Sequence, residues 1–356
     1  MKKAFLTTLQ IAVTVFAFWY VFHKPATREG IATAFQGGNN YWWLVAAVLM
    51  AGLAPACATV RLWLLLRVQA IHLPLRRVTQ LYMIGMFFNL FLPGSTGGDA
   101  VKLFYLLREN PDPGKRAGAF LAVVMDRLLG LVALAVLSIS FVVARYAWLT
   151  QLPDTTKWVN WFLGILGFGL FGIAVTVVAA QLDVVRFFPE KMPGRKAVVE
   201  LAAAVQSNTR AWRTSLACVL ISFVGHMAMF ITFYFAAMVI HAAVAFWDVT
   251  VVMPIVNTYA SLPVSLSGMG VRETITTSLL GGLCHLAPGV PVVISLVGFL
   301  CSTVFYGLLG GLFYLFFKGR AGAVPADVEA IEAREAEAAL PAMVAEASHP
   351  RPAADA

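Results

Sequence analysis

The sequence predicts an all-α polytopic membrane protein with six transmembrane helices and two opposed re-entrant helical hairpins, arranged as an inverted repeat. Three observations predict this fold. Of the 356 residues, 60% are hydrophobic and only 12% are charged, about half the charged share of a soluble domain. Apolar stretches long enough to cross a hydrocarbon core of about 30 Å recur along the chain. The basic residues concentrate in alternate loops between these stretches.

Six apolar stretches are the predicted spanning helices. The first follows Met1-Lys2-Lys3 and lacks a small-residue cleavage site, so it is interpreted as a retained helix and not as a signal peptide. The six stretches are Phe5–Phe22, Trp42–Leu66, Ala117–Ala144, Trp158–Leu182, Thr214–Ile240 and Val290–Phe317.

The distribution of lysine and arginine predicts the orientation. With the amino terminus in the cytoplasm, sixteen basic residues fall in inside segments and four fall in outside segments. This bias predicts a multi-pass membrane protein with both termini cytoplasmic. Residues 183–212 are expected to form an amphipathic helix on the cytoplasmic surface. The polar, Ala/Glu-rich tail at 321–356 is expected to be cytoplasmic, and we assign it no function.

Two further apolar segments fit the alternation only if they enter and leave on the same side. Residues 78–108 lie between two basic inside loops, and residues 249–285 lie between two outside loops. Each is interrupted near its middle by a Pro/Gly-containing break, at 92–99 and at 262–273. The alternative of eight full crossings would require residues 99–108 to span about 15 Å only. The sequence therefore favours re-entrant hairpins.

The hairpins divide the membrane part into two halves with one plan. Residues 1–147 form the predicted first repeat, and residues 158–318 form the second with the opposite orientation. Each half runs as helix, connector, helix, hairpin, helix. Such inverted repeats with broken helices near the midplane are typical of secondary transporters.

Six charged residues lie within apolar segments, away from the predicted loops. Counting 1.5 Å per residue from the nearest loop places Asp99, Arg127 and Glu273 about 13–18 Å into the membrane. An ionised group at that depth costs at least about 2.5–3.5 kcal/mol unless it is paired or hydrated. The six residues are Asp99, Lys102, Asp126, Arg127, Arg272 and Glu273.

Two interpretations of these charges remain open. They could neutralise one another as Asp99–Lys102, Asp126–Arg127 and Arg272–Glu273, although neighbours on a helix point about 100° apart and Asp126 is then poorly placed to pair with Arg127. They could instead bind a charged ligand. Arginine grips phosphate in a bidentate manner, and backbone N–H groups at the two breaks would attract an anion. The predicted substrate-binding residues are Asn89, Ser95, Thr96, Gly97, Gly98, Asp99, Lys102, Asp126, Arg127, Ser267, Gly268, Gly270, Arg272 and Glu273.

Three separated motifs resemble a known family. These are "NLFLPGSTGGDAVKLFYL" at 89–106, "VVMDRLLGLVAL" at 123–134 and "SLSGMGVRE" at 265–273. In order and spacing they resemble the flippase-like membrane domain of lysylphosphatidylglycerol synthases and of stand-alone bacterial relatives. The resemblance covers residues 1 to about 320. It implies movement of aminoacylated phosphatidylglycerol, or a role beside hopanoid or polyprenyl-linked glycan pathways. It also implies a location in the bacterial inner (cytoplasmic) membrane.

The sequence departs from the family pattern in places. Lys102 stands where the family leads us to expect arginine, and the second break is poorer in glycine. Residues 319–356 are too few for the soluble synthase domain, so we expect no lipid synthesis by this chain.

The expected function is that of a flippase-like translocator, which moves a phosphate-containing lipid headgroup, aminoacylated or not, between leaflets. An integral membrane transferase acting on a polyprenyl-phosphate or other lipid is the alternative, and a scaffold for lipid synthesis is another. The expected partners are membrane lipids and, by association, lipid-synthesis enzymes, with no nucleic acid. No cofactor, catalytic residue or metal ligand is predicted.

Some residues carry no functional signal. Cys57, Cys218, Cys284 and Cys301 are scattered through apolar sequence and are expected to pack as small hydrophobes. His226 lies within an apolar stretch, and packing or a helix-to-helix hydrogen bond is expected for it. The glycine-rich segment at 306–314 favours close helix packing.

Overall fold

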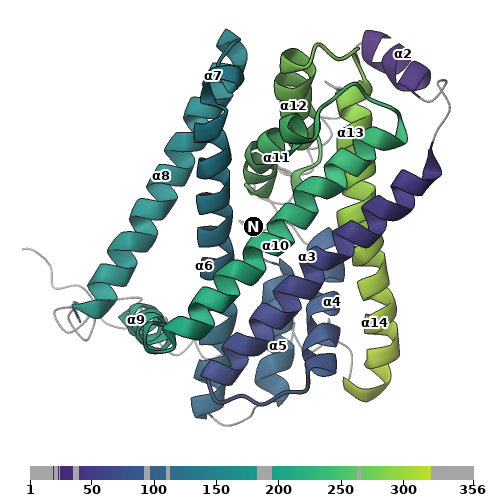
Figure 1. Cartoon of the computed structure of the whole chain (residues 1–356). Helices are drawn as coiled ribbons and strands as arrows, with labels where there is room; N and C mark the ends of the chain where they lie inside the picture. The colour runs from purple at the N-terminus through teal and green to yellow at the C-terminus, as the bar shows by residue number, and fades with distance from the viewer. Residues whose placement is uncertain are drawn as a thin grey trace, which may run out of the picture. The chain divides into compact units, whose positions relative to one another are not determined.

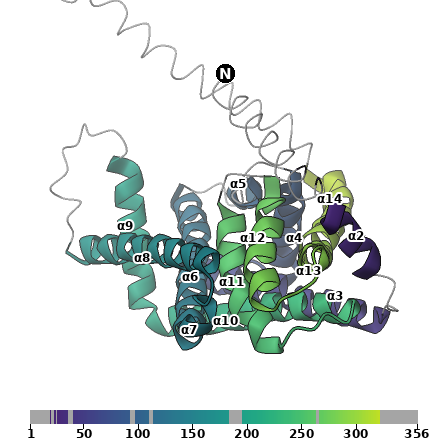
Figure 2. The same ribbon diagram turned by 90° about the horizontal axis from the view of Figure 1, so that it is seen from above.

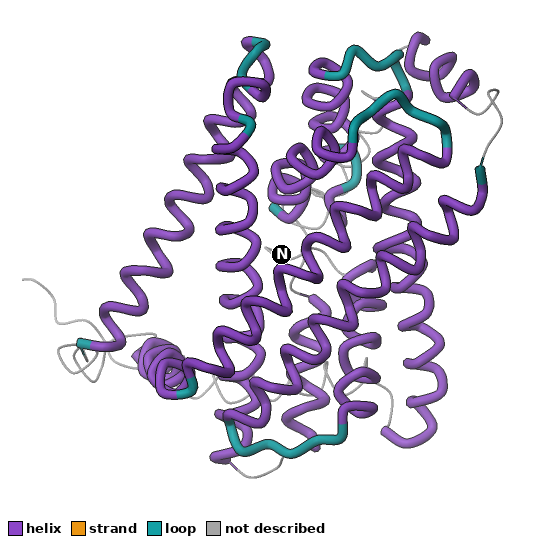
Figure 3. Tube along the Cα trace, in the orientation of Figure 1, coloured by secondary structure: helices purple, strands orange, loops and turns teal. Residues whose placement is uncertain are grey.

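The described part of the chain is entirely helical. The computed structural model describes residues 19, 23, 25–34, 40–91, 97–109, 113–182, 195–262 and 266–321. Figure 3 shows helices joined by loops, without a strand, among these residues. The chain divides into two units, Met1–Gly311 and Leu312–Ala356. The described part of the second unit is the end of one helix, up to Ala321.

The helices follow one another with short connections. Their bounds are α2 (Pro25–Ala34), α3 (Tyr41–Val68), α4 (Leu75–Phe91), α5 (Gly97–Glu109), α6 (Pro113–Ala144), α7 (Tyr146–Leu149), α8 (Pro153–Gln181), α9 (Arg195–Arg210), α10 (Trp212–Val239), α11 (Phe246–Ser261), the 3-10 turn η2 (Leu266–Gly268), α12 (Val271–Thr276), the π-helical turn η3 (Thr277–Gly281), α13 (Val290–Phe299), the π-helical turn η4 (Leu300–Val304) and α14 (Phe305–Ala321).

Five stretches in the described residues are long and apolar enough to cross a membrane, as the prediction of an all-α polytopic membrane protein requires. They match the second to sixth predicted spans. The first predicted span, at 5–22, falls almost wholly outside the described residues, so the count of six stays a prediction. The five are Tyr41–Val68, Lys115–Ala144, Pro153–Ala179, Trp212–Val239 and Val290–Phe316.

Helices α3 and α10 form the most extensive helix pair in the protein. They run side by side in both views of the ribbon (Figures 1 and 2). Small residues allow the approach, since a Cβ on Gly225 of α10 would lie 3.2 Å from the Cβ of Cys57 on α3. Asn40 caps the start of α3 by accepting a hydrogen bond of 3.2 Å from the Trp42 amide. Both hairpins pack against this pair of helices.

The segment predicted as the first hairpin is a helix, a break and a second helix. Helices α4 and α5 pack against each other, and their crossing point is made by two glycines. A Cβ on Gly98 would lie only 2.0 Å from the Gly85 carbonyl oxygen. At the other end of the two helices, Arg77 Nε donates a hydrogen bond of 2.7 Å to Glu109. The hairpin is therefore fixed at both ends.

The segment predicted as the second hairpin has the same plan. Helix α11 leads through η2 to α12, and α11 packs on both. The chain turns sharply here, because Ser267, Gly268 and Gly270 all have positive φ, at 50°, 74° and 81°. A Cβ on Gly268 would also lie 2.5 Å from the Ala260 carbonyl oxygen. Both reasons require glycine at this position.

The two hairpins approach from opposite ends of α3 and α10. In Figure 1, α4 and α5 lie in the lower half of the view, while α11 and α12 lie in the upper half. Their tips meet, because the Ser267 hydroxyl donates a hydrogen bond of 3.3 Å to the Asn89 carbonyl. Helices α4, α5 and α11 have 17, 13 and 16 residues, fewer than the roughly 20 that span a bilayer. Their re-entrant path in a membrane stays a prediction, as does the inverted repeat.

Other sequence predictions can be compared with the described residues. Helix α9 (Arg195–Arg210) covers the second part of the predicted surface helix at 183–212, and residues 183–194 fall outside the description. A Cβ on Gly310 would lie 2.0 Å from the Met83 carbonyl oxygen, as close packing of the 306–314 segment predicts. The π-helical turn η4 (Leu300–Val304) was not predicted.

Candidate functional site

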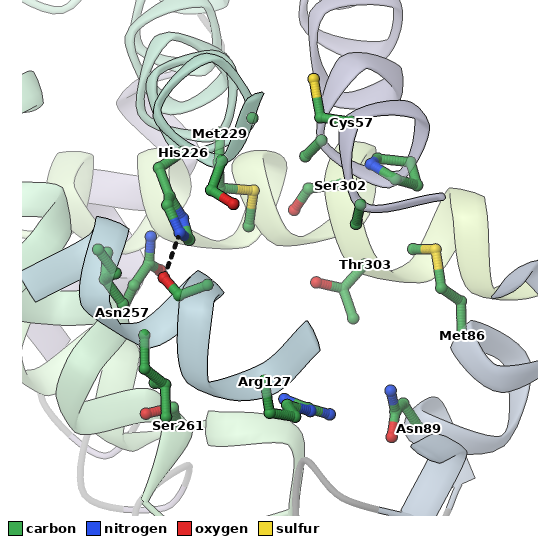
Figure 4. Close-up of a pocket in the computed structure, with 18 of the residues that line it drawn as sticks. Cys57, Met86, Asn89, Arg127, His226, Met229, Asn257, Ser261, Ser302 and Thr303 are labelled. Carbon is green, nitrogen blue, oxygen red and sulfur yellow. Dashed lines mark hydrogen bonds between the residues drawn. The ribbon is translucent and has the colours of Figure 1, made fainter. Parts of the chain in front are cut away.

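A cavity of about 460 Å³ lies where the hairpin tips meet α3, α6 and α10. Figure 4 shows side chains converging on it from α3, α4, α6, α10, α11 and the π-helical turn η4. One part of its wall is apolar and the other carries charged and polar groups. The polar and charged residues lining it are Arg61, Tyr82, Asn89, Asp99, Lys102, Asp126, Arg127, Ser222, His226, Asn257, Ser261, Ser267, Arg272, Ser302 and Thr303.

Asp99 holds two cations at the first hairpin. Lys102 Nζ, one turn later on α5, lies 2.5 Å from Asp99 Oδ1. Arg127 of α6 donates a hydrogen bond from Nε to Asp99 Oδ2. The Asp99 and Lys102 side chains are buried, whereas the Arg127 side chain is 40% exposed. Arg127 is therefore the member of this cluster that a molecule in the cavity reaches most easily.

Asp126 pairs with a different helix from its sequence neighbour. Arg61 of α3 donates a hydrogen bond of 2.7 Å from Nε to Asp126 Oδ1, and its Nη1 donates one of 2.8 Å to the Ser222 hydroxyl of α10. A Cβ on Gly130 would lie 2.7 Å from Arg61 Nη1, so glycine makes room for the guanidinium. The pairing of Asp126 with Arg127 considered in the sequence is absent among the described ion pairs, for the geometric reason given there.

Arg272, at the start of α12, is different from the other cations. It is 6% exposed, and its Nε and Nη1 have no hydrogen-bond partner among the described residues. Its Nη2 makes one long contact of 3.5 Å to the Ser267 carbonyl, and its guanidinium lies 4.6 Å from the centre of the Phe299 ring. A buried donor without an acceptor costs about 1–3 kcal/mol, and more if charged. The site thus contains a buried, unsatisfied cation, and Arg272 is one of the residues that line the cavity.

Glu273 does not neutralise this arginine by a described ion pair. Its Oε2 accepts a hydrogen bond of 2.6 Å from the Gly270 amide, and its Oε1 accepts one of 2.8 Å from the Ser295 hydroxyl of α13. Glu273 is 1% exposed and does not line the cavity. The structure therefore replaces its predicted contact with a ligand by a role in capping α12.

The backbone donors predicted to attract an anion are in part already engaged. The Gly98 amide donates a hydrogen bond of 2.7 Å to the Asn89 side chain, and the Gly270 amide donates to Glu273. Each hairpin thus satisfies an amide at its own break with a side chain. The prediction that these two amides face a ligand is wrong.

The structure brings most of the predicted site residues together. Gly97, Gly98, Gly270 and Glu273 are near the cavity in sequence but do not line it, and Ser95 and Thr96 lie outside the described residues. The predicted residues that line the cavity are Asn89, Asp99, Lys102, Asp126, Arg127, Ser267, Gly268 and Arg272.

Sequence reasoning missed several lining residues. Arg61 was not among the predicted site residues, although it lies within the apolar helix α3 and is 8% exposed. Ser302 and Thr303 line the cavity from the π-helical turn η4, which no sequence pattern predicted. His226 makes the expected helix-to-helix hydrogen bond, of 3.0 Å from Nε2 to the Gly130 carbonyl, and it also lines the cavity (Figure 4).

The comparison with protein families agrees with the arrangement of these motifs. The model of the lysylphosphatidylglycerol synthase TM region matches residues 7–310, which include both hairpins and every lining residue. This chain belongs to that family. The resemblance found in the sequence is thereby confirmed, and the chain is a multi-pass membrane protein of a family associated with lipid metabolism. No curated protein matches the chain with significance.

Proposed function

We propose that this protein moves a phosphate-containing lipid headgroup between the two leaflets of the bacterial inner membrane. The observation that carries the proposal is Arg272, a buried guanidinium with two unsatisfied nitrogens on the wall of the cavity. Phosphate oxygens accept charge-assisted hydrogen bonds from guanidinium N–H groups, and such bonds are stronger than neutral ones. The lipid-related family supports a lipid as the source of that phosphate.

The position of the cavity also supports translocation. It lies at the meeting point of two hairpins that arrive from opposite ends of the α3–α10 pair. A headgroup bound there would be about midway along its route, with acyl chains left in the bilayer. The polar wall would replace the water lost by the headgroup, and the apolar wall, which includes Leu131, Leu134 and Met229, would face the glycerol and upper chains.

The alternative of a membrane transferase receives less support from the cavity. A catalytic base needs a carboxylate that can accept a proton. Asp99 is held by Lys102 and Arg127, and Asp126 is held by Arg61. Both cavity carboxylates are thus already paired with cations of the protein, which suits a binding site better than acid–base chemistry.

The proposal is tested by reconstitution into liposomes that contain a trace of phosphatidylglycerol labelled on an acyl chain with a dithionite-sensitive fluorophore. Native protein should expose inner-leaflet label to external dithionite faster than protein-free liposomes do. Arg272→Gln should slow this movement by about ten- to hundredfold, the range of about 1.5–3 kcal/mol for a hydrogen bond to a charged group.

Two matched variants control for folding and for charge. Arg272→Lys keeps the charge but loses the planar donor pair, and it should fall between native protein and Arg272→Gln. Arg213→Gln removes an exposed arginine outside the cavity and should leave the rate unchanged. Movement by a monodisperse Arg272→Gln protein at the native rate would refute this site as the route.

A further inference from the structure

We infer that the headgroup accepted by this cavity is a net-anionic phosphate ester without a cationic arm, such as phosphoglycerol, and not an aminoacylated one. The inference rests on the proposed function and deepens it by naming the substrate class. It depends on the charges of the cavity wall, on how each carboxylate is used, and on the aromatic faces available to an ammonium.

The wall carries more positive than negative charge. Among its described residues, Arg61, Lys102, Arg127 and Arg272 are cations, and Asp99 and Asp126 are the carboxylates, so the excess is two positive charges. A phosphodiester headgroup with one negative charge reduces this excess. A lysyl ester of the same lipid adds two ammonium groups and increases it, and like charges repel strongly where water is scarce.

Neither carboxylate is available to receive an ammonium group. Asp99 is the partner of Lys102 and of Arg127, and Asp126 is the partner of Arg61. Glu273, behind the wall, uses one oxygen on the Gly270 amide and the other on the Ser295 hydroxyl. A cationic arm would have to share a carboxylate with one of the protein's own cations, which would repel it.

The remaining apolar sequence supplies no further carboxylate. The segments 92–96 and 263–265 read LPGST and PVS, and residues 1–24 contain no aspartate or glutamate. Whatever side chains these segments present, none of them is an acid.

Aromatic faces are the other means of holding an ammonium, and of the two aromatic residues that line the cavity, Phe230 is 1% exposed and Tyr82 already faces a cation. Tyr82 lines the cavity, and its ring faces Lys102 Nζ at 4.5 Å from the ring centre. The Phe299 ring faces the guanidinium of Arg272 at 4.6 Å. The described wall therefore offers donors to an anion and neither a free carboxylate nor an unoccupied tyrosine face to a cation.

The test compares phosphatidylglycerol with lysylphosphatidylglycerol of identical acyl chains. Binding is measured by native mass spectrometry on purified full-length protein with equal amounts of the two lipids, and movement is measured in the liposome assay. We expect phosphatidylglycerol to be retained and moved at least about tenfold better, which corresponds to about 1.4 kcal/mol. Equal or better binding of the lysyl lipid would overturn the inference.

A charge-adding variant tests the mechanism of the preference. Asn257 of α11 lines the cavity (Figure 4), and Asn257→Asp adds a carboxylate with almost no change of shape. The ratio of phosphatidylglycerol to lysyl lipid bound should fall by about tenfold, because the new carboxylate either holds an ammonium or neutralises an arginine. Asn160→Asp, on the exposed surface of α8, should leave the ratio unchanged. An unchanged ratio in Asn257→Asp would also overturn the inference.

The two readouts separate this inference from the proposed function. Preferential binding of phosphatidylglycerol without movement of either lipid would support the substrate class and refute translocation. Movement of both lipids at the same rate with equal binding would support translocation and refute the substrate class.

Discussion

The two hairpins satisfy a backbone amide at their breaks in the same way, but they arrange their charged side chains differently. In each, a side chain accepts a hydrogen bond from a glycine amide at the break, Asn89 for Gly98 and Glu273 for Gly270. In the first hairpin the acid of the break, Asp99, faces the cavity and holds two cations. In the second hairpin the acid is turned away as a cap, and the cation Arg272, which lines the cavity, has two buried nitrogens without a hydrogen-bond partner among the described residues.

This difference shows how one cavity can be stable without a ligand and still be able to bind an anion. In the first hairpin each charged group has a partner, because Asp99 pairs with both Lys102 and Arg127, although this cluster keeps one net positive charge. The second hairpin keeps an unsatisfied guanidinium, whose cost a bound anion would remove. Stability and ligand recognition are thereby assigned to different hairpins.

The largest expected effect comes from breaking the first hairpin at its glycine crossing. Gly98→Ala places a Cβ 2.0 Å from the Gly85 carbonyl oxygen, so α4 and α5 must separate, at a cost of about 1–3 kcal/mol or more. The measurement is the thermal unfolding midpoint in detergent, followed by size-exclusion chromatography. Gly164→Ala in α8, where nothing lies within 4 Å of the new Cβ, should be neutral or stabilising by up to about 1 kcal/mol. Equal midpoints for the two variants would contradict the described crossing.

An effect of comparable size should follow from removing the partner of a buried cation. Asp126→Asn leaves Arg61, which is 8% exposed, without its counter-charge, and such a loss costs up to about 3–5 kcal/mol where it is not relieved by water. The cavity beside Arg61 admits water, so the lower part of this range is expected. The double variant Arg61→Met with Asp126→Leu should recover most of the unfolding midpoint. A double variant less stable than Asp126→Asn would show that the pair is not the source of the effect.

The second hairpin should respond to loss of its cap and not to loss of its acid charge. Glu273→Ala removes the acceptors for the Gly270 amide and the Ser295 hydroxyl, which costs about 0.5–2 kcal/mol. Glu273→Gln keeps an acceptor of the same shape and should move lipid at close to the native rate, because residue 273 does not line the cavity. If Glu273→Gln lost transport at unchanged stability, Glu273 would have to be counted again among the substrate-binding residues.

The smallest perturbation tests whether the hairpins enter from opposite sides. A cysteine at Glu109, at the end of the first hairpin, should react with an impermeant maleimide only from the cytoplasmic side. A cysteine at the exposed Gln151 should react only from outside. Native Cys284 will compete little, because burial and the neighbouring Asp248 carboxylate raise the pKa of its thiol to about 12 and leave almost no thiolate at neutral pH. Labelling of both positions from the same side would contradict the prediction that the two hairpins enter the membrane from opposite sides.

Much of the fold could be predicted from the sequence because membrane helices can be recognised by their length and apolar composition. The same counting placed Asp99 and Arg127 at similar depths, and the structure has them in contact. Spacing along one helix gives depth, however, and says little about which neighbouring helix a side chain faces. For that reason the sequence argued against Arg127 as the partner of Asp126 but did not identify Arg61 of α3.

The remaining differences also have physical reasons. The roles of Arg272 and Glu273 depend on the positive-φ turn at 267–270, which decides which of two adjacent side chains faces the cavity. Ser302 and Thr303 reach the wall through a π-helical turn, whose extra residue shifts the helical register without a mark in the sequence. Neither the orientation of Arg272 and Glu273 nor the register shift at η4 follows from composition or periodicity.

The central claim is that a lipid phosphate contacts Arg272 inside the cavity, and photo-crosslinking tests it most directly. Phosphatidylglycerol carrying a photoactivatable diazirine near the phosphate is irradiated with the reconstituted protein, and modified peptides are mapped by mass spectrometry. The account predicts adducts on lining residues such as Met86, Met229 and Asn257, and their loss in Arg272→Gln. Adducts confined to lipid-facing residues such as Phe168 and Phe171 of α8, unchanged in Arg272→Gln, would contradict it.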